Sequence, residues 1–426
     1  MATLICISSF VHAQIKKLPI EIILAFLWLS FEIMHLFWSL SWPWMNLGNV
    51  FANKVAWIQW YEMVGVYGGS FWIILVNGLL YRTLKTILGK EFKTAMILSI
   101  LSLLLIFIPI LLSHTLIKNK LKENQKLSIT IIQPNIDTYI EKFDKLSPTE
   151  QSHLIINQLD HSPLSKLIIL PETVIPKTFN SQKSPYPQSI QLLLNWSKRN
   201  QKQLIGGFNT KDSLGFYNSA LYIEEGIIQQ KRNKIKLLPF GESMPFEWIY
   251  KVFKNQIARD GGNSFGYKKD KNATVFSINS HDSINLGTLI CFESAFPDIN
   301  SEMVRNGAHG LVVITNDDWW KDTPGHRQHF DYARIRAIEN RRFIIRSANT
   351  GISGFIDEYG RIIKQTSYQE HRSLTHQVTL IYELTFFTKY EAVMRWFYPL
   401  IALLMIAFSL LLFSSTKKQR KQALNI

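Results

Sequence analysis

Long apolar runs lie near both ends of the chain, whereas the middle mixes apolar and polar positions as soluble domains do. A helix that spans a bilayer needs about 20 mostly apolar residues. Four segments meet this requirement and are predicted to span a membrane: 20–40, 63–81, 95–115 and 395–413. The apolar stretch 1–13 is too short to span, and it lacks the basic start and small-residue cleavage site of a cleaved signal peptide.

These spans divide the chain into three predicted parts. Residues 1–117 form an N-terminal membrane domain with three spans, and residues 118–390 form a soluble domain. Residues 391–426 supply the last span and a basic tail. A soluble domain is therefore expected to be inserted between transmembrane helices.

Lysine and arginine in the short loops predict how the membrane part is oriented. Basic residues gather in three short segments: 16–17, 82–93 and 417–421. The loop 41–62 carries only Lys54. Because basic loops stay in the cytoplasm, both termini are expected inside and residues 116–394 outside. The basic stretch 118–126 does not oppose this orientation, since it opens a long domain and long domains follow the rule poorly.

Within 127–376, apolar runs rich in β-branched residues alternate with helical patterns. The predicted strands are Leu127–Gln133, Leu167–Leu170, Gln203–Gly207, Ser219–Ile223, Leu286–Cys291, Leu311–Thr315 and Phe343–Ser347. The predicted helices are 148–160, 188–200, 297–306 and 328–340, and 178–188 is a predicted loop. This alternation favours an α/β layered domain.

Charge and cysteine content narrow the class of protein. The net charge is +15, but no nucleic-acid-binding motif accompanies it, and much of the excess lies beside the apolar runs. Basic clusters in that position favour anionic lipid headgroups, so we expect a membrane and no nucleic acid as partner. The two cysteines, Cys6 and Cys291, lie in different parts of the chain without zinc-ligand spacing around them. Neither a disulfide framework nor a metal site is expected.

Polar side chains follow two apolar strands of the predicted soluble domain, where α/β folds expose reactive groups. Glu172 ends the run 167–172, and its carboxylate is either a general base or a solvated loop residue. Lys234 and Lys236 lie on one face of an extended chain, and a lysine there could hold a developing oxyanion. Spacing alone does not decide which of the two lysines has this role.

Two further segments follow later strands. Cys291 ends the run 285–291, where an isolated cysteine is more often an inert small hydrophobe. A nucleophilic cysteine needs a base and a cation, and the two preceding segments supply both. The fourth segment, 311–320, is followed by an arginine-rich helix. Its residues Arg336, Glu339 and Arg342 have helical spacing, which favours ion pairing.

Taken together, these segments resemble the nitrilase superfamily, whose members use a Glu–Lys–Cys triad in an αββα sandwich. The match is closer to one family within it, the apolipoprotein N-acyltransferases. The motifs are Leu170-Pro-Glu-Thr-Val-Ile-Pro176, Lys234 with Leu237-Leu-Pro-Phe-Gly-Glu242, Ile290-Cys-Phe-Glu-Ser-Ala-Phe-Pro297, Thr315-Asn-Asp-Asp-Trp-Trp320 and Arg336-Ala-Ile-Glu-Asn-Arg-Arg342. Aromatic, glycine and glutamate positions between 28 and 68 are similar to that family's later N-terminal helices. The resemblance covers about residues 24–413.

The resemblance implies a role for five residues. Glu172 matches the family's general base, Lys234 its catalytic lysine and Cys291 its nucleophile. Glu242 and Glu293 match additional active-site carboxylates. The position of the lysine before the Leu-x-Pro-Phe-Gly-Glu motif selects Lys234 over Lys236. No cofactor and no metal are implied.

Three features depart from the family pattern. The family usually has more spans before the catalytic domain, so a shortened N-terminal membrane region is expected here. Lys321 replaces the glycine that commonly follows the Asn-Asp-x-Trp-aromatic motif, and Phe292 stands where tyrosine is common. Within the first predicted span, Glu32 and His35 are costly in hydrocarbon, so we expect them to face the protein interior near the lipid entrance. Interfacial snorkelling is the alternative for that pair.

The resemblance implies an enzyme of lipoprotein maturation in the bacterial inner membrane, with its catalytic domain in the periplasm. It would transfer an acyl chain from a phospholipid, through a Cys291 thioester, to the N-terminal amine of a diacylglyceryl-cysteine lipoprotein. One alternative is a membrane-anchored amide hydrolase of the nitrilase type, in which water resolves the acyl-enzyme. A scaffold or transporter subunit is disfavoured, because all three triad residue types are present and no inverted repeat is seen.

Overall fold

The computed structural model describes residues 2–118, 125–162, 165–246, 266–278 and 284–424, with side chains up to residue 417. Most of the basic stretch 118–126 lies outside the described residues. The chain forms two compact units. One contains Met1–Asn119 and Tyr390–Ile426, and the other contains Lys120–Lys389.

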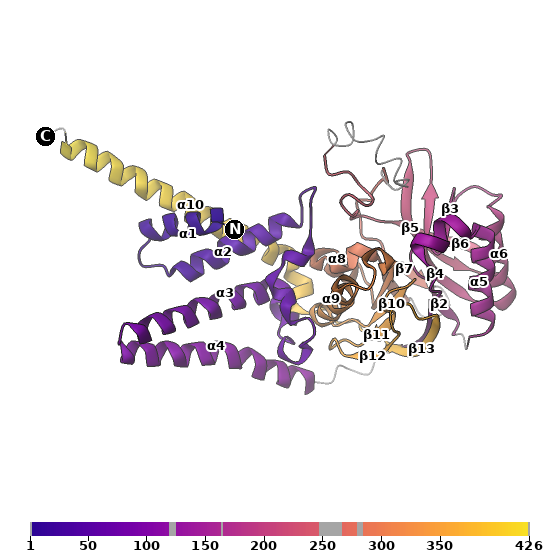
Figure 1. The fold of residues 1–426 in the computed structure, drawn as a ribbon, viewed down its shortest axis with the longest axis horizontal. Coiled ribbons are helices and arrows are strands. Elements are labelled where there is room, and N and C mark those ends of the chain that lie inside the picture. The colour runs from indigo at the N-terminus through magenta and orange to yellow at the C-terminus, as the bar shows by residue number, and fades with distance from the viewer. Residues whose placement is uncertain (1, 119–124, 163–164, 247–265, 279–283, 425–426) are drawn as a thin grey trace. The chain divides into compact units, whose positions relative to one another are not determined.

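The first unit is helical (Figure 1). Its helices are α1 (Ala2–Gln14), α2 (Ile20–His35), α3 (Tyr61–Leu88), α4 (Phe92–Lys118) and α10 (Phe386–Leu424). Among the described residues, three helical segments are long and apolar enough to cross a membrane: Tyr61–Leu88, Phe92–Lys118 and Phe386–Lys417. They contain three of the four segments that the sequence predicts to span.

The structure shortens the other predicted span, 20–40. Helix α2 has 16 residues and ends at His35. At 1.5 Å per residue it is about 24 Å long, less than the roughly 30 Å of bilayer hydrocarbon. The chain then forms three 3₁₀ turns: Pro43–Met45, Leu47–Phe51 and Val55–Trp57.

Glu32 faces the interior of this unit, as predicted. Its side chain is 1% exposed, and its Oε1 accepts hydrogen bonds from Trp28 Nε1 and from the Leu47 backbone N–H, both at 2.8 Å. The carboxylate thus satisfies a backbone donor in the segment after α2. His35 is only half-buried and stacks on the Phe31 ring at 5.6 Å, so the pair does not share one environment.

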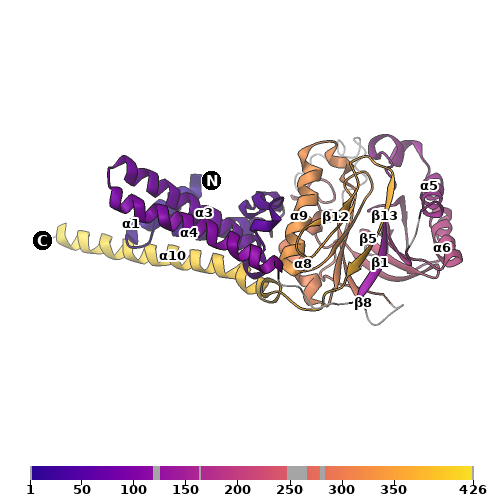
Figure 2. The ribbon, with the colours of Figure 1, turned by 90° about the horizontal axis from the view of Figure 1, so that it is seen from below.

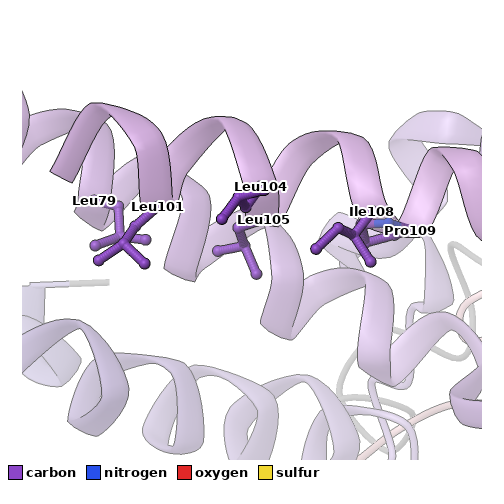
Figure 3. A pocket seen from close by; sticks show the side chains of 6 residues that line it. All are labelled: Leu79, Leu101, Leu104, Leu105, Ile108 and Pro109. Carbon is purple, nitrogen blue, oxygen red and sulfur yellow. The ribbon is translucent and has the colours of Figure 1, made fainter. Parts of the chain in front are cut away.

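An apolar pocket of about 350 Å³ lies between α3 and α4. Figure 3 shows its lining: Leu79, Leu101, Leu104, Leu105, Ile108 and Pro109. Pro109 lacks the N–H that would bond the Leu105 carbonyl in a regular helix. Trp72 Nε1 of α3 donates to that carbonyl at 2.7 Å, so the proline leaves no orphaned acceptor in an apolar setting. The pocket is therefore lined by apolar side chains, and the Leu105 carbonyl beside it has a hydrogen-bond donor.

The second unit contains two β-sheets. In the first, the strand order is β13 (Arg372–Thr379), β1 (Lys126–Gln133), β2 (Leu167–Ile169), β4 (Gln203–Lys211), β5 (Phe216–Glu224) and β6 (Ile227–Asn233), with β3 (Ile175–Phe179) beside β4. In the second, it is β12 (Ile362–Gln365), β11 (Gly354–Ile356), β10 (Ile344–Ala348), β9 (Gly310–Thr315), β8 (Ile284–Ile290) and β7 (Phe276–Ile278). Strands β1, β2 and β4 are parallel, and so are β8, β9 and β10.

The sheets pack face to face with helices outside, which confirms the predicted αββα sandwich. Figure 2 shows α5 (Pro148–Asp160) and α6 (Gln188–Asn200) on one side, and α8 (Pro297–Arg305) and α9 (Pro324–Asn340) on the other. Along β2, Leu167 and Ile169 join the core between the sheets, whereas Ile168 joins the core beneath α5 and α6. Both strand faces are buried, which explains the continuous apolar runs in the sequence.

All seven predicted strands and all four predicted helices of this unit are confirmed. Helix α5 begins as its sequence requires, because Ser147 and Glu150 form a reciprocal capping box and Pro148 occupies the first turn. The sequence analysis missed the remaining strands, among them β3, β6 and β13, which are short or carry many polar residues. It also missed a π-helical turn, Thr138–Lys145.

Candidate active site

Glu172 lies three residues beyond the end of β2 and is 6% exposed. Its Oε1 accepts a hydrogen bond from Asn218 Nδ2 at 2.7 Å and lies 3.3 Å from Lys234 Nζ. Its Oε2 accepts from the backbone N–H of Asn316 at 3.1 Å. The loop can approach β4 closely because a Cβ at Gly207 would lie 2.6 Å from the Glu172 Cα. The carboxylate is therefore held by both sheets.

Lys234 follows β6 directly and is 1% exposed. Its ammonium is 3.3 Å from Glu172 and 2.8 Å from Glu242. Burial opposes the charge, but the Glu242 and Glu172 carboxylates outweigh burial and hold the lysine pKa above its usual range. The Lys236 ammonium instead lies 4.9 Å from the centre of the Phe296 ring. Of the two lysines that the spacing left open, Lys234 is the one paired with Glu172.

Cys291 follows β8 and begins a 3₁₀ turn, Cys291–Ala295, with φ of +51°. This left-handed conformation is uncommon for a residue with a side chain and marks a sharp turn at the strand end. Burial and the Glu172 carboxylate raise the pKa of the thiol, and the Lys234 ammonium lowers it. The net direction is upward, so the resting side chain is a thiol that must lose its proton before it can attack.

Glu242 belongs to the same polar group. Its carboxylate pairs with Lys234, accepts from Asn218 Nδ2 at 2.8 Å and accepts from the Leu238 N–H at 2.9 Å. Asn218, on β5, therefore bridges the two carboxylates that share Lys234. The sequence analysis missed this asparagine, because an isolated polar residue in a strand carries no pattern of its own.

Glu293 has a different environment. It is 0% exposed, and its two oxygens accept from the two terminal nitrogens of Arg232 at 2.8 and 2.9 Å. They also accept from the backbone N–H groups of Ile235 at 2.6 Å and Ile290 at 2.8 Å. Glu293 thus joins the segment before Lys234 to the strand before Cys291. Within the described part of the chain, no hydrogen bond or ion pair links it to the three predicted triad residues.

A buried polar group lies beside the Cys291 backbone. The Cys291 carbonyl accepts from Ser294 Oγ at 2.8 Å, and His329 Nε2 lies 3.2 Å away. His329 Nδ1 lies 2.9 Å from Asp317, which also pairs with Arg346 at 2.6 Å. Burial alone would raise the pKa of Asp317, but Arg346 and His329 reverse this and hold it well below its usual range. The sequence pattern does not connect these residues, because they lie in four different elements.

The arginine-rich helix confirms part of the ion-pairing prediction. Arg336 and Glu339 form a buried pair at 3.0 Å. Arg342 lies beyond the end of α9, and its guanidinium donates to the carbonyls of Ala308 and Glu383 at 2.7 and 2.8 Å. Its predicted ion pair is therefore replaced by bonds to backbone, because the helix stops two residues earlier.

Comparisons with known proteins show the family of the chain. Residues 129–384 match the carbon-nitrogen hydrolase family, and residues 1–79 match the apolipoprotein N-acyltransferase N-terminal domain. The apolipoprotein N-acyltransferase of Chlorobaculum tepidum is 30% identical over 398 residues, covering 86% of this chain and 72% of the relative. The enzyme of the same name from Geobacter metallireducens is 29% identical, covering 87% of this chain and 70% of the relative. That from Thermotoga maritima is 26% identical, covering 91% and 71%. With its sandwich, its apolar helices and these relatives, the chain belongs to the apolipoprotein N-acyltransferase family of the carbon-nitrogen hydrolases.

Proposed function

We propose that the protein is a membrane-bound N-acyltransferase of lipoprotein maturation. It takes a fatty acyl chain from a phospholipid and transfers it to the N-terminal amine of a diacylglyceryl-cysteine lipoprotein. The observation that carries the proposal is the grouping of Glu172, Lys234 and Cys291 at adjoining strand ends. That grouping occurs in a chain whose membrane part also matches the family. Both substrates are lipids, which accounts for apolar helices of spanning length.

In the first half-reaction, Glu172 accepts the Cys291 proton and the sulfur attacks an ester carbonyl of the phospholipid. The carbonyl oxygen becomes an oxyanion beside the Lys234 ammonium, whose raised pKa keeps it charged. Losing one such stabiliser typically lowers the rate by about 10²–10³. The ester C–O bond then breaks, the leaving alkoxide takes the proton from Glu172, and a lysophospholipid departs. A thioester on Cys291 remains.

In the second half-reaction, the lipoprotein amine attacks the thioester carbonyl. Glu172 accepts a proton from the attacking nitrogen, and Lys234 again faces the oxyanion. The C–S bond breaks, the sulfur regains a proton, and an amide is released. The sequence of steps is ping-pong, so the acyl-enzyme accumulates when the acceptor is withheld.

The first prediction concerns this acyl-enzyme. The purified protein is incubated with a phospholipid of defined chains and without acceptor, and its intact mass is measured. Wild type should gain one acyl chain, because Cys291 keeps it as a thioester. Cys291→Ala should gain none. Cys6→Ala is the matched control, since Cys6 is exposed on α1 in the other unit, and it should behave as wild type.

A diacylated lipopeptide is then added to the acylated protein. Transfer of the chain to the peptide amine supports the acyltransferase. Release of free fatty acid with no amide would favour the membrane-anchored hydrolase, in which water resolves the thioester. An adduct that persists in Cys291→Ala would contradict the role of this cysteine.

A further inference from the structure

The π-helical turn Thr138–Lys145 directs one lysine inward. Lys142 is 1% exposed, whereas Lys145 on the same turn is exposed. Within the described ranges, no hydrogen bond or ion pair reaches the Lys142 ammonium; its backbone carbonyl accepts from Gln151 Nε2 at 2.6 Å. A buried charge without a direct partner is costly. Its position therefore calls for a role beyond folding.

Hydrogen bonds connect this turn to the candidate general base. The Thr138 backbone N–H donates to Asp318 Oδ2 at 2.6 Å, and Asn316 Nδ2 donates to the Thr138 hydroxyl at 3.0 Å. The backbone N–H of Asn316 in turn donates to Glu172 Oε2 at 3.1 Å. Hydrogen bonds thus link the π-helical turn to the residues after β9, and these to the Glu172 carboxylate. Lys142 belongs to this turn.

Among the described residues, negative charge is in excess around Glu172, and Lys142 reduces that excess. Glu172 and Glu242 share a single cation, Lys234, at 3.3 and 2.8 Å. Asp318 adds a further carboxylate, and the attraction of Lys142 is strongest to Glu172 and then to Asp318. An excess of negative charge favours protonation of a carboxylate, and a proton on the base would block catalysis.

Among the residues that the structure describes, the other titratable groups near Glu172 supply no second cation. Burial, together with the Glu242 and Glu172 carboxylates, raises the pKa of Tyr267 to about 12, so that phenol is neutral. Cys291 is a thiol at rest, because burial raises its pKa. Asp317 is already paired with Arg346 at 2.6 Å. Burial lowers the pKa of Lys142 to about 8 against the pull of the two carboxylates, so the side chain is cationic at and below neutral pH.

We propose that Lys142 is a positioning residue whose buried positive charge stabilises the negative charge of the Glu172 carboxylate, the group that accepts the Cys291 proton. This inference rests on the proposed role of Glu172 as the base. Lys142 needs no contact with substrate. It acts by offsetting part of the negative charge of Glu172 and Asp318 across a distance longer than a hydrogen bond.

The second prediction tests this charge. Full-length Lys142→Met is compared with wild type between about pH 5 and 10, measuring kcat/KM for the phospholipid donor with a diacylated lipopeptide as acceptor. Removing a cation near a carboxylate should move the acid limb of the profile upward by about one pH unit. The two profiles should converge above about pH 8, where wild-type Lys142 itself loses its proton. Lys145→Met, on the same turn, should follow wild type.

Stability separates this role from a structural one. Methionine has similar length and no charge, so Lys142→Met should unfold at the same temperature or higher. Lys142→Arg should keep the wild-type acid limb where it folds. A Lys142→Met profile that overlies wild type, or that is lowered equally at every pH, would overturn the inference.

A substrate-independent readout keeps the inference testable if acylation fails. In a Cys6→Ala background, the rate of Cys291 alkylation by iodoacetamide is followed against pH with and without Lys142→Met. The same upward movement of the acid limb is expected. Absence of amide product in wild type and Lys145→Met would count against the proposed function, whereas identical alkylation profiles would count against the role of Lys142 alone.

Discussion

At the scale of single residues, neighbouring charges decide what each side chain can do. Cys291 is a thiol at rest because burial and Glu172 raise its pKa more than Lys234 lowers it. Reaction therefore requires transfer of its proton to a base, and a preformed thiolate is not available. Lys234 has the opposite balance, since two carboxylates outweigh burial and keep it charged. The Glu172 carboxylate thus has two effects. It disfavours the thiolate form of Cys291, and it favours the charged form of Lys234, the group that faces the oxyanion.

Glu293 shows why a residue beside the nucleophile need not touch substrate. Its carboxylate forms a bidentate pair with Arg232, and both side chains are 0% exposed. Removing one partner of a buried pair typically costs about 3–5 kcal/mol, because the other charge is left uncompensated. Glu293 therefore contributes to the site through the strand ends that it joins.

The third prediction follows from this pair. Glu293→Gln should lower the thermal unfolding temperature of the catalytic unit by roughly 6 °C or more, as expected for a loss of about 3 kcal/mol in a domain of this size. Arg232→Met combined with Glu293→Leu should recover part of the loss, since no buried charge then remains. If Glu293→Gln abolished acyl transfer at an unchanged unfolding temperature, a direct chemical role would be indicated instead.

At the scale of elements, the site is assembled where parallel strands of two sheets end. Glu172 follows β2, Cys291 follows β8 and Asn316 follows β9. Each strand is buried on both faces, where an unpaired polar side chain would be costly. Polar side chains therefore appear where the strand ends. The approach of the Glu172 loop to β4 depends on Gly207, whose hypothetical Cβ would lie 2.6 Å from the Glu172 Cα.

The fourth prediction tests that approach. Gly207→Ala should displace the Glu172 loop, because the added methyl group meets backbone atoms that cannot rotate away. A displacement of about 1 Å can cost around 10²-fold in rate, so kcat should fall by one to two orders of magnitude. Gly310→Ala on β9 is the control, because its Cβ meets only side-chain atoms, at 3.3 Å or more. Equal kcat values in the two variants would contradict a packing role for Gly207.

At the scale of the whole molecule, the predicted side of the catalytic unit does not depend on α2, whereas the predicted side of the N-terminus does. Four basic residues lie at the end of α3, in the turn after it and at the start of α4: Arg82, Lys85, Lys90 and Lys93. If that turn lies in the cytoplasm, α4 leads outward to the catalytic unit, and α10 returns to a basic tail. We propose on this ground that the protein lies in the bacterial inner membrane with the catalytic unit in the periplasm.

The fifth prediction concerns this orientation. Single cysteines are introduced in a Cys6→Ala, Cys291→Ala background at two exposed positions, Lys90 between α3 and α4 and Ser213 between β4 and β5. A membrane-impermeant maleimide added to spheroplasts should label Ser213→Cys at once. It should label Lys90→Cys only after the membrane is disrupted. The reverse pattern would place the catalytic unit in the cytoplasm.

The sequence by itself determined the class of fold and the principal chemistry. The strand and helix patterns between 127 and 376 predicted an α/β domain, because buried strands need apolar residues on both faces. Glu172, Lys234 and Cys291 were named from motifs at strand ends, and the structure brings them together. Apolar length also located α3, α4 and α10, but it overestimated α2, because local hydropathy does not report where a chain turns.

Only the tertiary structure decided which hydrogen bonds and ion pairs hold the site together. Asn218, His329 and Lys142 carry no local signal, because their importance lies in contacts with residues far away in the chain. The same holds for Glu293, which stands two residues after the nucleophile yet pairs with Arg232 on β6. Electrostatic interaction depends on distance in space and on burial, and a linear pattern encodes neither. The side chains could therefore be named from sequence, but their charges could be balanced only in the folded protein.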